Sequence, residues 1–246
     1  MVDRQFSDAD LARLYDAFTL EEDRDDFRFY LPLVMESDAV LDVGCGTGKL
    51  LRMARESGHT GRLCGLDPAE GMLARARTRD DITWVLGKLR SADLHGEFDL
   101  VVMTGHAFQV FVDDDEIIEA LSAIRGLLTG RGLFAFETRN PAHRAWETWR
   151  PDNVLSIVDT DGATVQLAHR VDSPFDGRTV SFTSVYSGPR WEEPRLSQST
   201  LRFLDADALA GFLTGAGLLV DQQFGDWDGS PLTATSPEII TFARRA

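Results

Sequence analysis

Hydrophobic and polar positions follow two different periods along the first 140 residues of the chain. Short apolar runs, which predict buried strands, occupy residues 39–43, 62–66, 82–86, 98–103 and 131–137. Stretches with polar residues and apolar residues at helical spacing lie before and between them, at residues 8–18, 23–35, 48–57, 69–78 and 114–127. This alternation of strand and helix predicts a parallel sheet with helices on both of its faces.

The pattern changes near residue 150. Four strand-like segments follow one another at residues 154–160, 163–171, 178–187 and 198–203. Asp-Gly pairs at 161–162 and 176–177 lie between them as turn signals, so we expect an antiparallel meander inserted into the α/β core. The chain then returns to a helix at 205–215 and to strands near 217–224 and 237–244.

The segment from Val40 to Gly48 reads Val-Leu-Asp-Val-Gly-Cys-Gly-Thr-Gly, a strand pattern that runs directly into three alternate glycines and then a helix. Such a junction leaves free backbone N–H groups at the start of the helix, and glycines let a ligand approach the backbone closely. Lys49 occupies the place of the third glycine in a dinucleotide-binding loop, which argues against that motif. A Walker A loop needs glycine at Val43 and serine or threonine at Leu50, and the chain has neither.

An acidic residue follows at a matching distance. Asp67 lies 19 residues after Gly48, at the end of the second predicted strand. In nucleotide sites of this topology, an acid at about this spacing accepts hydrogen bonds from ribose hydroxyls. Pro68 comes next, and we expect it to open the following helix in its first turn.

The loop from Asp42 to Gly48 and the acid at Asp67 resemble the cofactor motifs of the class I S-adenosylmethionine-dependent methyltransferases, and the resemblance covers about residues 38–140 well. It implies a Rossmann-like, doubly wound α/β sheet of about seven strands with the last strand antiparallel. It also implies S-adenosylmethionine as the cofactor and an O or N nucleophile of a small molecule as the methyl acceptor. The expected cofactor contacts are Asp42, Gly44, Cys45, Gly46, Gly48, Asp67, Pro68, Met72, Lys88, Leu89, Thr104, Gly105 and Tyr15.

Four of these contacts carry specific expectations. Asp42 has an alternative role as a negative charge that suits the nearby helix N-terminus. The family commonly has an acidic or amide residue at the position of Lys88, where it contacts the adenine amino group. Lysine has donors only, so the backbone of Lys88 and Leu89 is left as the expected contact. Tyr15 is included because N-terminal helices in this family often close over the cofactor.

Two residues are candidates for catalysis. His106 follows the fourth strand, where ligands bind if the first and fourth strands flank the point at which strand order reverses. Its ordinary pKa suits proton removal near neutral pH, and the alternative is a histidine that packs against the cofactor or caps a turn. Glu137 ends the fifth strand as a second candidate base or substrate anchor, unless it pairs with Arg139 as a structural ion pair.

These observations divide the chain into three parts. Residues 1–37 form an N-terminal helical cap, and residues 38–150 and 204–246 form the cofactor-binding core. Residues 151–203 form the antiparallel insert, which we expect to be a substrate lid or a dimer surface.

Composition limits the remaining choices. The chain has 246 residues and a formal net charge of −15, which disfavours nucleic acid as a partner and favours a small-molecule substrate. There is neither a signal-peptide pattern nor an apolar run of membrane-spanning length, so we expect a cytoplasmic protein without a membrane partner. The cysteines at 45 and 64 are expected to be reduced, and the scattered histidines predict no metal site. The protein is expected to be a monomer or a homodimer.

Two rival functions remain at this point. The first is a nicotinamide-dependent oxidoreductase on a similar sheet, which Lys49 disfavours. The second is a non-catalytic S-adenosylmethionine-binding sensor or scaffold, because binding and turnover use the same loop and the same acid. Fold alone does not choose between a binding module and an enzyme.

Overall fold

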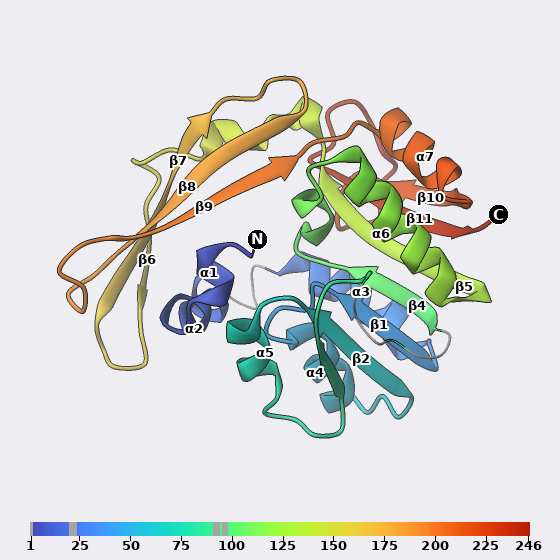
Figure 1. Ribbon diagram of the computed structural model, residues 1–246, viewed down its shortest axis with the longest axis horizontal. Helices are drawn as coiled ribbons and strands as arrows, with labels where there is room; N and C mark the ends of the chain where they lie inside the picture. The colour runs from blue at the N-terminus through green and yellow to red at the C-terminus, as the bar shows by residue number, and fades with distance from the viewer. Residues whose placement is uncertain (1, 20–23, 91–93, 95–97) are drawn as a thin grey trace.

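A seven-stranded sheet forms the centre of the computed structural model, which describes residues 2–19, 24–90, 94 and 98–246 (Figure 1). Its strand order is β10-β11-β5-β4-β1-β2-β3. Only β11 runs antiparallel to its neighbours. The strands are β1 (Ala39–Val43), β2 (Arg62–Asp67), β3 (Thr83–Leu86), β4 (Phe98–Met103), β5 (Leu128–Arg139), β10 (Leu218–Phe224) and β11 (Glu238–Arg245).

Helices cover both faces of this sheet because its central strands are apolar on both sides. In β4, Val101 and Met103 pack into one core cluster while Leu100 and Val102 pack into another, as the period of two requires. The first cluster is covered by α6 (Asp114–Leu127) and α7 (Ala206–Gly215), and the second by α3 (Asp25–Met35) and α4 (Lys49–Glu56). The short helix α5 (Glu70–Ala76) packs beside β2 and β3.

The insert forms a separate four-stranded antiparallel sheet at the upper left of Figure 1. Its strands are β6 (Leu155–Val158), β7 (Thr164–Ser173), β8 (Thr179–Ser187) and β9 (Arg195–Arg202). The N-terminal helices α1 (Arg4–Ser7) and α2 (Ala9–Phe18) lie between this sheet and the core. They are tied to the insert by the Gln5 backbone N–H, which donates to Ser197 Oγ over 2.9 Å, and to the core by packing against α5.

The predicted α/β fold with an antiparallel last strand and an inserted meander is confirmed. Several bounds differ from the prediction; β5, for example, spans Leu128–Arg139 where a strand was expected at 131–137. The helix expected at 8–18 is α2, which begins at Ala9 because Asp8 caps it by accepting the N–H groups of Asp10 and Leu11; the short helix α1 before it was not predicted. Pro68 does not open a helix, because the Asp67 carboxylate accepts the Ala69 N–H over 2.7 Å and this turn delays α5 to Glu70.

Among the described residues, three short 3₁₀ helices were not predicted, because each is a single turn with too few residues to show a period: η2 (Ala107–Val110), η3 (Pro141–His143) and η4 (Ala145–Thr148). Cys45 and Cys64 are free and buried. Within the described ranges, none of the helices combines the length and the apolar character that crossing a membrane requires.

Candidate functional site

The glycine loop leaves the central sheet where strand order reverses. β1 pairs with β2 on one side and with β4 on the other, so the expected position of the first and fourth strands is confirmed. Gly44, Gly46 and Gly48 have φ values of +75°, +56° and +73°, a region that side chains rarely allow. A Cβ on Gly48 would also lie 2.2 Å from Cη2 of Trp84, so the indole ring and the loop fit together only with glycine there.

Asp67 connects the glycine loop to the neighbouring strand ends. Its carboxylate accepts the Gly46 N–H over 2.8 Å and the Ala69 N–H over 2.7 Å. Its carbonyl oxygen accepts the Gly87 N–H over 3.0 Å, which brings the turn containing Lys88 and Leu89 to the same edge. Burial raises the pKa of Asp67, and the two backbone hydrogen bonds to its carboxylate act in the opposite direction.

Asp42 is a buried acid with an unused hydrogen-bonding atom. Its side chain is 1% exposed, and Oδ1 has no hydrogen-bond partner among the described residues. Burial, together with the nearby Asp67 and Glu137 carboxyls, raises the pKa of Asp42 to about 8. An unpaired buried carboxylate is costly, so this position favours a ligand that brings a positive charge or a hydrogen-bond donor.

A pocket opens beside Asp42, between the glycine loop, the end of β4 and the N-terminal helices. Its volume is about 30 Å³, far below the roughly 300–1,000 Å³ of a typical ligand pocket. Helix α2 covers this pocket. Thr47 Oγ1 of the glycine loop donates a hydrogen bond to Asp16 Oδ1 of α2 over 2.7 Å. The expected contacts that line this pocket are Tyr15, Asp42, Gly44, Cys45, Gly46, Thr104 and Gly105.

The other expected contacts lie around the pocket and do not line it. Met72 is buried against Gly46, about 4.0 Å from where a Cβ would stand on that glycine. Pro68 and Lys88 are exposed, and Leu89 packs against the sheet. Gly48 packs on Trp84, while Asp67 holds the loop from behind through Gly46.

Several residues that line the pocket were missed: Asp16, Arg24, Phe27, Thr47, Lys49 and Leu50. Asp16 follows Tyr15 on the helix that was expected to close over the cofactor, which was the available signal. Arg24 was not predicted because no sequence motif marks it. It lies just before α3, where its guanidinium pairs with Asp26 at 2.6 Å and stacks over the Phe27 ring at 3.8 Å.

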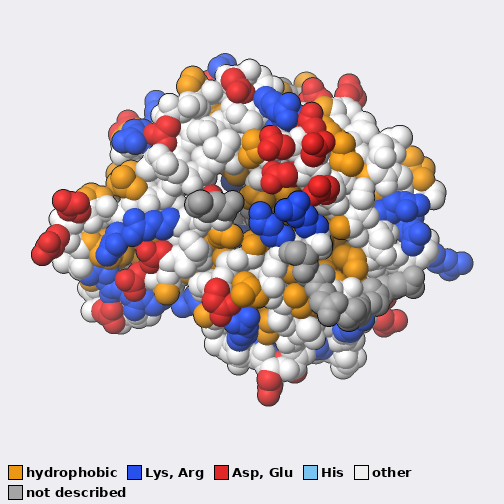
Figure 2. Space-filling model, viewed as in Figure 1, with side chains coloured by type: hydrophobic (Ala, Val, Ile, Leu, Met, Phe, Trp, Pro, Cys, Tyr) orange, Lys and Arg blue, Asp and Glu red, His pale blue; other side chains and the backbone are white. Residues whose placement is uncertain are grey.

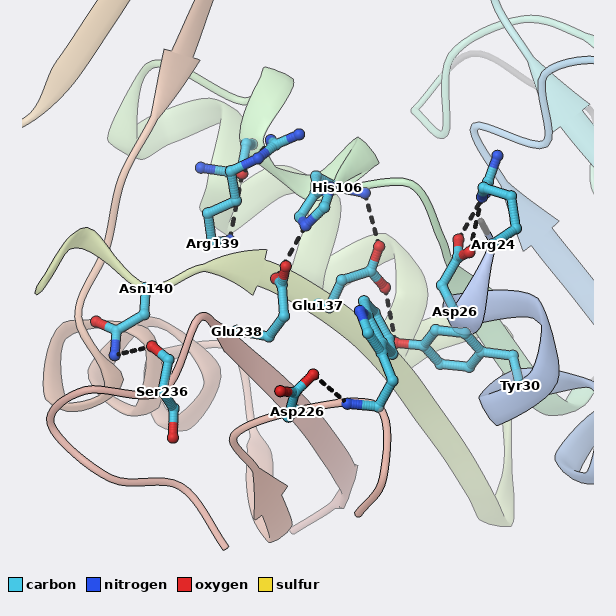
Figure 3. A network of polar contacts seen from close by, with 12 residues as sticks. Arg24, Asp26, Tyr30, His106, Glu137, Arg139, Asn140, Asp226, Ser236 and Glu238 are labelled. Atoms are coloured by element: carbon cyan, nitrogen blue, oxygen red, sulfur yellow. Dashed lines mark hydrogen bonds and ion pairs between the residues drawn. The ribbon is translucent and has the colours of Figure 1, made fainter. Parts of the chain in front are cut away.

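The two catalytic candidates belong to one network (Figure 3). Glu137 is fully buried, and both of its oxygens are engaged. Tyr30 donates its hydroxyl hydrogen to Oε2 and His106 donates its backbone N–H to Oε1, each over 2.7 Å. Burial raises the pKa of Glu137 to about 8, although both hydrogen bonds act against that shift. Glu137 was expected to present its carboxylate at the rim of the sheet. Its two oxygens instead bind Tyr30 and the backbone N–H of His106, so Glu137 holds the loop that contains His106.

The ion pair considered between Glu137 and Arg139 does not form. Arg139 instead donates from a guanidinium nitrogen to Gln109 Oε1 over 3.0 Å. Its guanidinium also lies 5.6 Å from the centre of the Trp149 ring, a cation–π distance that joins the core to the segment preceding the insert. Arg139 thus stands beside the His106 network as a cation that Glu137 does not neutralise.

Glu238 belongs to this network and was not predicted as a site residue. It is the first residue of β11 and stands opposite Arg139 in the register of β11 with β5. Because β11 is antiparallel, its amino end lies at the edge of the sheet where the parallel strands end. That property of the predicted last strand was the signal that could have identified Glu238.

Comparisons with known proteins agree with this geometry. Residues 40–132 match the family model described as a methyltransferase domain. A malonyl-[acyl-carrier protein] O-methyltransferase of Anoxybacillus flavithermus is 26% identical over 144 residues, 56% of this chain, and the match spans 54% of that protein, about half its length. The cypemycin N-terminal methyltransferase of a Streptomyces species is 27% identical over 216 residues, 86% of this chain and 84% of that protein.

The fold is also shared with solved structures. The CcbJ methyltransferase from Streptomyces caelestis superimposes with a TM-score of 0.77 at 21% identity, covering 98% of this chain and 99% of that one. The sheet order and the glycine loop thus define a Rossmann-like methyltransferase fold. The match of residues 40–132 to the methyltransferase-domain model agrees with this fold and supports the predicted resemblance to the class I S-adenosylmethionine-dependent methyltransferases.

The residues at the glycine loop fit the cofactor of this family. S-adenosylmethionine carries a positive sulfonium and an ammonium group, and the unpartnered Oδ1 of buried Asp42 suits a positively charged donor. The 30 Å³ pocket is too small for the whole cofactor, so we expect the elements that line it to separate when the cofactor binds. In the part of the chain that the structure describes, no group of three or more His, Cys, Asp or Glu side chains is arranged to hold a metal ion.

Proposed function

We propose that this protein binds S-adenosylmethionine at the glycine loop and transfers its methyl group to an O or N nucleophile of a small molecule. The observation that carries the proposal is the presence of two acidic side chains, Asp42 and Asp67, on either side of the glycine loop. One carboxyl is buried without a partner for Oδ1, and the other is fixed by the Gly46 and Ala69 N–H groups. A cation reaching Asp42 would relieve the cost of its burial.

We assign roles to several of the expected cofactor contacts. The positive-φ glycines would let the backbone approach the ligand closely, and Thr104 and Gly105 line the same pocket. Asp67 would accept the ribose hydroxyls with the lone pairs that its two backbone donors leave unused. Lys88 and Leu89 follow Gly87 at the same edge, where their backbone would contact adenine.

The chemistry asks for alignment more than for activation. When bound, S-adenosylmethionine would supply a methyl group on positively charged sulfur. The lone pair of the acceptor would attack the methyl carbon in line with the carbon–sulfur bond, and sulfur would leave. The protein has to hold the acceptor on the far side of that methyl group and exclude water. His106, at the end of β4 next to Gly105, would take the proton of an acceptor that arrives protonated.

A small-molecule acceptor fits the charge of the protein. Acidic side chains gather near the N-terminal end of α6 on the face drawn in Figure 2, where Asp114, Asp115 and Glu116 form the first turn. With a net charge of −15, most of the surface would repel a polyanion such as DNA or RNA. The four-stranded insert, which reaches the N-terminal helices, would form the lid over the acceptor.

A peptide amine is the second candidate acceptor. The observation that favours it is the similarity to the cypemycin N-terminal methyltransferase, which extends over 86% of this chain. Such an acceptor would carry one amine into the same site and leave the rest of the peptide outside. The two candidates therefore differ in the size of the acceptor and share the catalytic arrangement.

The test is turnover with a panel of acceptors. Purified protein with S-adenosylmethionine is incubated with small amines including amino sugars, with their matched hydroxyl analogues, and with short peptides, and S-adenosylhomocysteine is quantified. Release that depends on a small acceptor supports the proposal. Release with peptides alone would support the second candidate, and binding of the cofactor without release would favour a sensor or scaffold.

A further inference from the structure

His106 and Glu238 form a hydrogen-bonded pair that joins two segments far apart in the chain. Nε2 of His106 lies 2.9 Å from Oε2 of Glu238. The histidine follows β4, and the glutamate begins the antiparallel strand β11. Figure 3 shows the imidazole ring directed at this carboxyl group, while the His106 backbone N–H is directed at Glu137.

The backbone of His106 is held in an unusual conformation. Its φ is 61°, a left-handed value that is uncommon for a residue with a side chain. The hydrogen bond from its N–H to Glu137 maintains it, and the Tyr30 hydroxyl holds Glu137 in turn. Such backbone conformations persist where the surrounding contacts enforce them. In this conformation the His106 ring faces Glu238.

We propose that Glu238 is a positioning residue that accepts the Nε2 hydrogen of His106 and thereby leaves Nδ1 as the nitrogen that takes the acceptor's proton. This inference rests on the proposed methyl transfer. A carboxylate only accepts hydrogen bonds, so Nε2 must be the donor when Glu238 is ionised. Nδ1 then keeps its lone pair, and among the described residues it has no hydrogen-bond partner. The His106 side chain is 18% exposed, so the ring is not sealed off.

The proton transfer balances without a further reactant. The O–H or N–H bond of the acceptor breaks, its proton forms a new N–H bond at Nδ1, and the electron pair stays on the acceptor. A lone pair of the acceptor forms the bond to the methyl carbon while the carbon–sulfur bond breaks and its electrons remain on sulfur. Glu238 stabilises the imidazolium that results, as a carboxylate does in a histidine–carboxylate pair.

Charged groups from several elements surround the pair and affect its titration. They are Glu137 and Arg139 of β5, Asp26 and Tyr30 of α3, Arg24 before α3, His143 of η3 and Asp226 after β10. Burial raises the pKa of Glu238 to about 8, with Arg139 acting against the shift. Burial, helped by Arg139, lowers the pKa of His106 well below its ordinary value. Because the two groups share a hydrogen bond, they titrate together, and the form with a free Nδ1 appears as the pair loses its proton near pH 8.

The test reads the proton position directly and needs no acceptor. In ¹⁵N-labelled protein, long-range ¹H–¹⁵N spectra report which ring nitrogen of each histidine carries hydrogen. The chain has five histidines, and the signals that disappear in His106→Gln are those of His106. We expect hydrogen on Nε2 at pH 9 and a titration step of the His106 signals near pH 8. Hydrogen on Nδ1 at pH 9 would overturn the inference.

Glu238→Gln separates a positioning role from a purely structural one. An amide can face Nε2 with either its oxygen or its NH₂ group, so we expect a mixture of tautomers and loss of the step near pH 8. The matched control is Glu192→Gln, which replaces an exposed carboxyl group of the insert and should leave the His106 signals unchanged. Unchanged His106 signals in Glu238→Gln would overturn the inference. Calorimetry with S-adenosylmethionine on the same samples tests the proposed function separately.

Discussion

Thr47 of the glycine loop donates a hydrogen bond to Asp16 of helix α2 over 2.7 Å, and this contact joins the N-terminal helices to the candidate cofactor site. Two arginines reach the same carboxylate more loosely, Arg75 at 3.7 Å and Arg52 at 3.9 Å. Asp16 therefore fastens α2 across the loop, α4 and α5. Because the pocket next to this contact measures about 30 Å³, we expect the contact to loosen when a ligand enters.

Thr47→Val removes that hydrogen bond while keeping the shape of the side chain. We expect association of S-adenosylmethionine to become faster, because α2 opens more readily, and dissociation to become faster as well. Stopped-flow tryptophan fluorescence measures both rates. Thr214→Val, an exposed threonine on α7, is the control. Identical association rates in Thr47→Val and wild type would show that α2 does not control access.

Gly48→Ala tests the packing of the loop on Trp84. A methyl group at Gly48 would stand 2.2 Å from the indole and would have to adopt a φ of +73°. We expect a loss of about 1–3 kcal/mol in the free energy of unfolding from strain and overpacking. Gly211→Ala on α7 meets no atom within 4 Å and should be neutral or stabilising. Urea unfolding of both variants makes the comparison, and equal stabilities would contradict it.

Asp42 makes the stability of the protein without ligand depend on pH. Its pKa is about 8 in the folded protein and about 3.9 in an unfolded chain. Between these values the folded state holds a proton that the unfolded state has lost, so the contribution to stability falls as pH rises from about 4 to 8.

Asp42→Asn removes this titration, so we expect a shallower fall in stability between pH 5 and pH 8. The difference in slope approaches about 1.4 kcal/mol per pH unit if one full proton is involved. Chemical unfolding at a series of pH values measures it, with the exposed Asp152→Asn as the control. A slope equal to that of wild type would mean that Asp42 is ionised throughout this range.

His106→Gln tests the proposed base. With the acceptor found in the panel, we expect kcat to fall by about 10²–10⁴, because a positioned general base contributes on that order. The affinity for S-adenosylmethionine should stay within about twofold, since Thr104 and Gly105 line the pocket and His106 lies beyond them. A kcat equal to that of wild type would mean that the acceptor arrives already deprotonated.

The fold followed closely from the sequence because its signals are local. The helix expected at residues 114–127 and the strand expected at 98–103 have those bounds in α6 and β4, where apolar residues repeat with a clear period. The glycine loop was equally predictable, because each of its three positive-φ positions favours glycine. Pro68 failed as a helix start because a side-chain hydrogen bond of Asp67, which no period reveals, closes a turn first.

The catalytic surroundings were less predictable because they depend on contacts across the chain. Glu137 was expected at the rim, yet the Tyr30 hydroxyl, from a residue 107 positions away, occupies one of its oxygens. Glu238 reaches His106 across 132 positions, through the register of an antiparallel strand. Sequence patterns identify which residues end each strand, while the partners they meet are decided by packing of distant elements.

The most direct test of the account is calorimetric titration of S-adenosylmethionine into wild type and Asp67→Ala. Asp81→Ala, which removes an exposed carboxyl on a neighbouring loop, serves as the control. We expect micromolar binding by wild type and by the control, and binding weaker by about 1–3 kcal/mol in Asp67→Ala through loss of hydrogen bonds to the polar ligand. Absence of binding by folded wild type, or equal affinity in Asp67→Ala, would contradict the cofactor site placed at the glycine loop.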